Sequence, residues 1–149
     1  MFDFGCHRIE VLANVFGQIT KVKALTANVI FERDVEDTAA ALFQFAGGAC
    51  AALSVTHAVS EPQDTLDIFG RHGSIHIPVL NEGAMRIVTR EVERWERHPP
   101  DANLHAPLIS DFVDAVLNNH EPAVTGETGR MVAMVEEKVY AEGGVSFTL

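Results

Sequence analysis

The sequence predicts an α+β fold, with a large, open-faced and predominantly antiparallel β-sheet and helices packed on one of its faces. Short runs of β-branched or apolar residues follow one another through the middle of the chain, separated by turn signals at short intervals. Runs with helical periodicity stand at both ends of the chain. The 149 residues are 47% hydrophobic, which is enough for one core. We therefore expect a single domain over residues 1–149.

The first expected elements are a helix, a strand and a hairpin. Apolar residues recur at helical spacing over His7–Phe16, and Gly17 can cap the end of this helix. A strand is expected over Val22–Phe31. The pair Gly47-Gly48 then separates two strand-like runs, over residues 39–45 and 49–55, which is typical of a β-hairpin.

Four more strands are expected before the helices at the end of the chain. They lie over Thr65–Phe69, Ser74–Val79, Met85–Thr89 and Val92–Glu96. Since short turns join them, we expect an antiparallel meander. The sheet would keep one face without a helix, which favours a homo-oligomer formed through that open face, with Trp95 in the contact.

Two helices complete the expected fold. Pro107 opens the first, because a proline costs no hydrogen bond in the first helical turn. Thr125 can cap the second, which runs to the pair Gly143-Gly144.

Charge and cysteine content exclude several classes of partner. Eleven Lys and Arg against 21 Asp and Glu give a net charge of −10, which argues against binding to nucleic acid or to an anionic membrane. Cys6 and Cys50 form no metal-binding motif, so no metal is expected. Isolated cysteines and the lack of a visible signal segment favour a cytoplasmic location.

A pair of polar residues near the start of the chain has the character of an acid–base site. Asp3 and His7 are four residues apart, about one helical turn. Histidine titrates near neutral pH, and a carboxylate one turn away can orient its ring.

Five motifs occur in order along the chain. They are D-x-G-x-H at Asp3–His7, V-E-D-T-A at Val35–Ala39, D-T-L-D-I-F-G at Asp64–Gly70, P-P-x-x-N-x-H-x-P-L-I-x-D-F at Pro99–Phe112 and T-G-E-T-G at Thr125–Gly129. This succession resembles the C-terminal domain of the Gfo/Idh/MocA oxidoreductases over residues 3–140. The resemblance implies that His7 exchanges the hydroxyl proton of a sugar, polyol or related substrate and that Asp3 orients it.

Three further residues are candidate substrate contacts. His57 lies at the end of an expected strand and could line a substrate pocket or lie free on the surface. Asn103 and His105 precede the Pro107 helix and could cap it or touch a small-molecule substrate.

The resemblance implies NAD or NADP for the complete family enzyme, held by an N-terminal Rossmann domain. This chain has no G-x-G-x-x-G, and no E-K-P motif of the kind that the family carries in its Rossmann half. We therefore expect no cofactor bound by this chain, no hydride transfer without a Rossmann domain, and a separate Rossmann domain as one conceivable partner.

Two other functions stay open at this point. The chain could be a stand-alone dimerising or small-molecule-binding module that has lost redox activity. It could also be an α+β hydrolase or isomerase that uses Asp3 and His7, although it shows no nucleophile or oxyanion motif.

Overall fold

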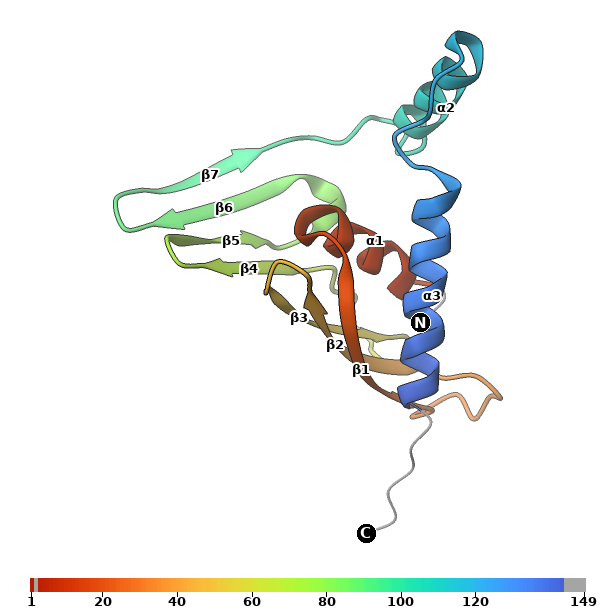
Figure 1. Cartoon of the computed structure of the whole chain (residues 1–149). Helices are drawn as coiled ribbons and strands as arrows, with labels where there is room; N and C mark the ends of the chain where they lie inside the picture. Colours follow the sequence, from red (N-terminus) through yellow and green to blue (C-terminus); the bar gives the residue numbers. More distant parts are fainter. Residues whose placement is uncertain (2, 144–149) are drawn as a thin grey trace. The chain divides into compact units, whose positions relative to one another are not determined.

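The computed structural model describes Met1 and residues 3–143. The chain divides into two compact units (Figure 1). The first contains Met1–Ser60 and the chain from Val124 onward, and the second contains Glu61–Ala123.

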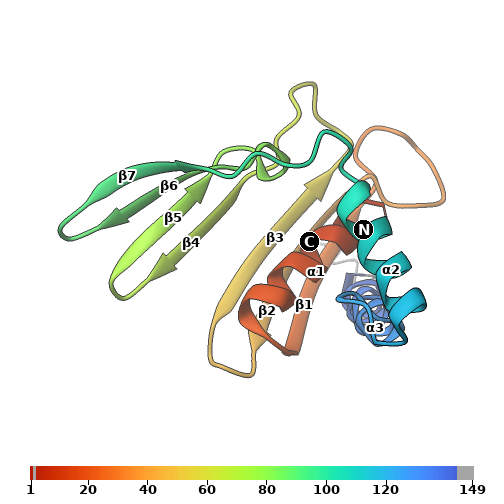
Figure 2. The ribbon, with the colours of Figure 1, turned by 90° about the horizontal axis from the view of Figure 1, so that it is seen from above.

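The first unit is a three-stranded antiparallel sheet with two helices on one face. Its elements are α1 (Gly5–Phe16), β1 (Ile19–Ala27), β2 (Thr38–Phe45), β3 (Cys50–Thr56) and α3 (Gly126–Gly143). The strand order is β1-β2-β3, so β2 is central. Figure 2 shows α1 lying over the sheet, and α3 packs along β1.

Alternation along β2 decides which face of this sheet is covered. Phe43 and Phe45 are 2% and 1% exposed, whereas Leu42 between them is 61% exposed. The buried face meets Ile9 of α1 and Val139 of α3, both of which are fully buried. The other face of the sheet is open.

Glycines end the first helix and turn the hairpin where positive φ angles are needed. Gly17 has φ of 84° and donates its N–H to the carbonyl of Ala13, which caps α1. Gly48 has φ of 90° in the turn between β2 and β3, as the Gly47-Gly48 pair predicts.

The second unit is a four-stranded antiparallel meander followed by a helix. Its elements are β4 (Leu66–Gly70), β5 (Gly73–Ile77), the short 3₁₀ helix η1 (Leu80–Glu82), β6 (Ala84–Thr89), β7 (Glu93–Arg97) and α2 (Ala106–Asn118). The strands are hydrogen-bonded in the order β4-β5-β6-β7. Gly73 permits close pairing, because a Cβ there would lie 2.3 Å from the carbonyl oxygen of Val88.

The predicted α+β class, the antiparallel pairing and the placing of helices on one sheet face are confirmed. The strands are hydrogen-bonded in two sheets, of three and four strands. The expected strand Val22–Phe31 is shifted: β1 begins at Ile19 and ends at Ala27. The carboxylate of Asp37 accepts the N–H groups of the next residues, so these cannot join the ladder.

The helices at the end of the chain begin almost where proline and threonine place them. Helix α2 starts at Ala106, one residue before Pro107. The hydroxyl of Thr125 accepts the N–H of Thr128 at 3.4 Å and caps α3. None of the helices described over residues 3–143 is long and apolar enough to cross a membrane.

Candidate functional site

The start of α1 presents the predicted acid–base residues to solvent. Asp3 lies in the turn before the helix and His7 in its first turn, and both are exposed. Gly5 is buried at this point and donates its N–H to the carbonyl of Met1 at 2.8 Å. The N-cap residue of the helix, Phe4, makes no side-chain capping hydrogen bond, so the Asp3 carboxylate does not cap the helix from that position.

The structure brings His57 to the same place. Nε2 of His57 lies 3.5 Å from a carboxylate oxygen of Asp3. The rings of Phe4 and His57 are in contact, with centroids 4.8 Å apart. Two segments more than fifty residues apart in sequence therefore form one polar surface with an aromatic wall.

The backbone around His57 is held by the beginning of β2. The N–H of His57 donates to the carbonyl of Asp37 at 2.8 Å. Thr56, the last residue of β3, shares a 2.8 Å hydroxyl contact with Thr38 and accepts the N–H of Ala58. The turn after β3 is thus anchored, which gives His57 a defined position beside Asp3.

An acidic residue lies in the core beneath α1. Glu136 of α3 is 4% exposed, and its Oε1 has no hydrogen-bond partner among the described residues. Burial raises the pKa of this carboxyl, and positive charge at the amino terminus and at His7 offsets part of the rise. Burial raises the pKa of the Cys6 thiol, and the negative charge of Glu136 raises it further.

A second carboxylate, that of Glu36, is partly buried and is paired. Glu36 accepts a hydrogen bond from the hydroxyl of Tyr140 at 2.5 Å and pairs with the amino group of Met1. Burial works to raise the pKa of Glu36, but these hydrogen bonds outweigh it and the pKa is lowered.

Sequence reasoning missed Glu136, although the sequence of α3 carries a signal for it. Val132, Val135 and Val139 form an apolar stripe, and Glu136 occupies a position on the same buried side. Burying a carboxylate among apolar side chains costs free energy unless the carboxylate is paired. An acidic residue inside an apolar stripe is therefore a signal that can be read from the sequence.

Asn103 and His105 lie in the second unit, in the turn that leads into α2. The side-chain oxygen of Asn103 accepts the N–H of His105 at 3.1 Å, and its carbonyl accepts the N–H of Ala106. The His105 side chain makes no capping hydrogen bond to α2 and is exposed. Asn103 therefore shapes the turn, and the contact of either residue with a substrate stays a prediction.

The strands described here are arranged differently from those of a dinucleotide-binding unit. All neighbouring strands in the two sheets pair antiparallel, whereas the dinucleotide-binding unit needs parallel strands joined by a helix. In the described part of the chain, no three His, Cys, Asp or Glu side chains cluster closely enough to hold a metal ion.

Solved structures share the fold over almost the whole chain. UDP-N-acetylglucosamine 3-dehydrogenase from Acidithiobacillus ferrooxidans superposes with a TM-score of 0.82 at 22% identity, over 94% of this chain and 45% of its own. An oxidoreductase from Agrobacterium radiobacter, solved with NAD⁺, L-tartaric acid and magnesium, gives 0.83 at 17% identity, over 99% and 47%. An aldose–aldose oxidoreductase from Caulobacter crescentus, solved with glycerol, gives 0.83 at 22% identity, over 99% and 46%.

This chain therefore spans slightly less than half the length of each of those proteins. Among curated proteins, no sequence match is found. The family model of the GFO/IDH/MocA C-terminal domain matches residues 1–76, just over half of the chain and including the Asp3–His7 turn. The chain thus belongs to the GFO/IDH/MocA family of oxidoreductases and corresponds to its C-terminal domain.

Proposed function

We propose that this chain is the substrate-binding and subunit-association half of an NAD- or NADP-dependent oxidoreductase that acts on a sugar, a polyol or a related hydroxy compound. The observation that carries the proposal is the family match over residues 1–76, which includes both Asp3 and His7. Dehydrogenases and other oxidoreductases among the structural neighbours support this class of reaction.

The chain's own contribution would be proton transfer and substrate placement. Oxidation of an alcohol removes a hydride from carbon and a proton from oxygen, so a base must lie beside the hydroxyl. The exposed imidazole of His7 would accept this proton. Asp3 and His57, whose side chains already meet, would hold the substrate or the base in place. Asn103 and His105 would be further substrate contacts.

The nicotinamide would come from a dinucleotide-binding domain outside residues 1–149, on the same or a separate polypeptide, and would take the hydride. This division of labour agrees with the antiparallel strands of this chain, since the dinucleotide-binding unit is built from parallel strands joined by a helix.

Association would use the open face of the three-stranded sheet. Leu25 and Leu42 are both 61% exposed there, on neighbouring strands. Exposed apolar side chains gathered on a sheet face favour contact with a second copy of the chain. The same surface would serve a stand-alone dimerising module, which is the alternative function.

A chimera tests the proposal. The half of the Agrobacterium radiobacter enzyme that this chain does not match is fused to it, and NADH formation is followed with a panel of aldoses, polyols and hydroxy acids. We expect turnover of at least one compound by the chimera and none by either half alone. We also expect no NAD binding by this chain in a calorimetric titration.

A folded chimera that binds NAD but oxidises none of the panel would favour the stand-alone module. Micromolar binding of NAD to this chain alone would contradict the proposed division between the two halves.

A further inference from the structure

The three lysines of the chain, Lys21, Lys23 and Lys138, all lie along one edge of the first unit. Lys21 and Lys23 are on β1, and Lys138 is on α3, which packs along β1 (Figure 1). Arg130 of α3 adds a fourth positive side chain nearby. The chain carries a net charge of −10, so a surface that gathers positive charge is unusual in it.

A groove of about 370 Å³ runs between β1 and α3 beside these cations. Four apolar side chains contribute to its lining: Val22, Met131, Met134 and Val135. Met134 is 49% exposed, and methionine side chains adapt to the shape of a partner. At the far end of β1 the strand and the helix touch, since the hydroxyl of Thr26 donates to the carbonyl of Gly143 at 3.2 Å.

The main chain of β1 has one unpaired side. In the order β1-β2-β3 it is an outer strand, and β2 is the single described strand to which it is hydrogen-bonded. Alternate residues of such a strand direct their N–H and C=O groups away from the sheet. The edge runs over the nine residues of Ile19–Ala27, and a typical strand has about five or six residues. It is therefore long enough to accept one more strand.

Two of the positive side chains at the groove are without an ion pair. Lys23 and Arg130 each pair with a glutamate of α3, at 2.6 and 2.7 Å. Lys21 and Lys138 line the groove and form no ion pair with a described residue. Both are exposed, so their charges are available to a partner.

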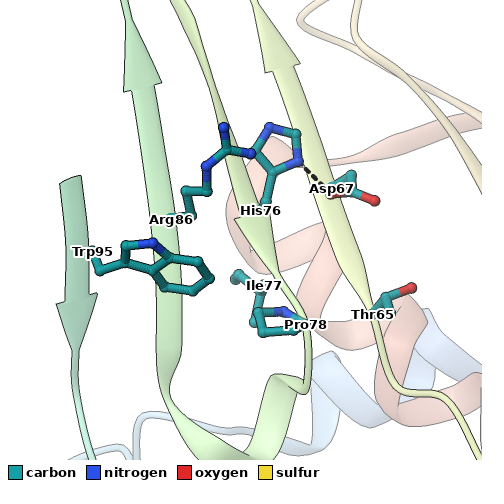
Figure 3. A pocket seen from close by; sticks show the side chains of 7 residues that line it. All are labelled: Thr65, Asp67, His76, Ile77, Pro78, Arg86 and Trp95. Atoms are coloured by element: carbon teal, nitrogen blue, oxygen red, sulfur yellow. Dashed lines mark hydrogen bonds and ion pairs between the residues drawn. The ribbon is translucent and has the colours of Figure 1, made fainter. Parts of the chain in front are cut away.

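The hollow on the sheet of the second unit differs in this respect (Figure 3). There Nδ1 of His76 lies 2.6 Å from the carboxylate of Asp67, and Nε of Arg86 lies 2.9 Å from Glu93. Each ionisable side chain in that lining thus has a partner within the chain. The groove beside β1 combines unpaired charge, apolar lining and free main chain.

These three properties together select the kind of occupant. A small anion would use the lysines but leave the apolar lining and the strand edge uncovered. A second copy of β1 would bring the lysines of two chains together, and like charges on paired strands repel each other. An extended peptide with acidic and apolar residues in alternation would use all three properties.

We propose that the edge of β1 and the groove beside it bind an extended segment of another protein in which acidic and apolar residues alternate. The segment would add a strand to β1 through main-chain hydrogen bonds. Its apolar side chains would enter the groove against Val22 and Met134, and its acidic side chains would lie within reach of Lys21 and Lys138. This binding would not depend on redox activity.

Fluorescence anisotropy of labelled peptides tests the proposal on the full 149-residue chain. The probe is fluorescein-EVEVEVE-amide. One control, fluorescein-KVKVKVK-amide, reverses the charge, and the other, fluorescein-EEEVVVE-amide, keeps the composition without the alternation. We expect a Kd of about 10–100 µM for the probe and binding at least about tenfold weaker for both controls.

Charge-reversed variants locate the binding. Lys21→Glu/Lys138→Glu should lose the acidic peptide and gain the lysine peptide, because its charge preference is inverted. Arg33→Glu is the matched control, since Arg33 is an exposed cation of the same unit outside the groove, and it should change neither affinity. Bound peptide should also slow hydrogen exchange of amides in Ile19–Ala27. Circular dichroism checks that each variant is folded.

Four results would overturn the proposal. The first is no saturable binding of the acidic peptide up to about 1 mM, ten times the upper expected Kd. The second is equal affinity for the alternating and the rearranged peptide, which would mean ionic attraction alone. The third is unchanged binding by Lys21→Glu/Lys138→Glu. The fourth is protection of the β1 amides that rises with the concentration of the chain alone, which would assign the edge to a second copy.

Discussion

Asp37 shows how one side chain decides where a strand ends. Burial works to raise its pKa, but the carboxylate accepts the N–H groups of Val29, Ile30 and Phe31 and the hydroxyl of Thr38. The effect of the hydrogen bonds exceeds that of burial, and the pKa of Asp37 falls to about 2. The aspartate of the V-E-D-T-A motif thus closes the loop between β1 and β2, and its carbonyl also holds His57.

We expect Asp37→Asn to lower the melting temperature by about 5 °C at pH 7, because an amide oxygen is a weaker acceptor for several N–H groups. The pKa of Asp37 is lowered on folding, so its contribution is complete above the ordinary pKa of 3.8. It disappears as the pH falls through the folded value of about 2. The curves of melting temperature against pH for wild type and variant should therefore converge in acid.

Asp34→Asn is the matched control, since this aspartate is exposed in the same loop. Identical curves for the two variants would contradict the role given to Asp37.

Sequence reasoning found the candidate site only in part. Asp3 and His7 share a motif, and His57 shows itself as a polar residue at a strand end. The contact of Asp3 with His57 could not be foreseen, because the fold alone brings the end of β3 against the turn before α1. Glu136 was missed because a pattern of apolar residues does not say which neighbours a buried carboxylate will have.

At the scale of elements, the sequence predicts a strand or helix correctly where its turn residues and apolar pattern end at the same residue as the folded element. Strands β4 to β7 lie within one or two residues of the expected runs, because short turns separate them. Strand β1 differs, since apolar residues continue past its end into Val29–Phe31, which the Asp37 carboxylate holds in a loop. A hydrogen bond from a side chain to the backbone six to eight residues away leaves no periodic signal.

The alternation along β2 gives a direct test of its two faces. Phe43→Ala should destabilise the chain by about 3–5 kcal/mol, because it opens a cavity in the core. Leu42→Ala, one residue away on the open face, should cost the unassociated chain less than about 0.5 kcal/mol. Urea unfolding followed by circular dichroism measures both. Equal losses would mean that the helices do not cover the face assigned to them.

At the scale of the whole molecule, the open sheet face predicts association. The chain should sediment as more than a monomer at tens of micromolar, a concentration at which many moderate interfaces form. The double variant Leu25→Lys/Leu42→Lys should sediment as a monomer, since it places two charges in the apolar contact.

Leu117→Lys is the control, because Leu117 is 77% exposed on α2 and lies outside that face. A monomeric wild type would refute the association, and equal dissociation by both kinds of variant would refute its location.

The central claim is that this domain supplies the base for alcohol oxidation, and the rate of NADH formation by the chimera tests it most directly. We expect His7→Ala to lower this rate by about 10²- to 10⁴-fold, as loss of a general base does. Asp3→Asn should cost less, because the amide keeps the shape of the side chain. Asn14→Ala, an exposed position on the same helix, should have no effect. Wild-type activity in a folded His7→Ala chimera would contradict the account.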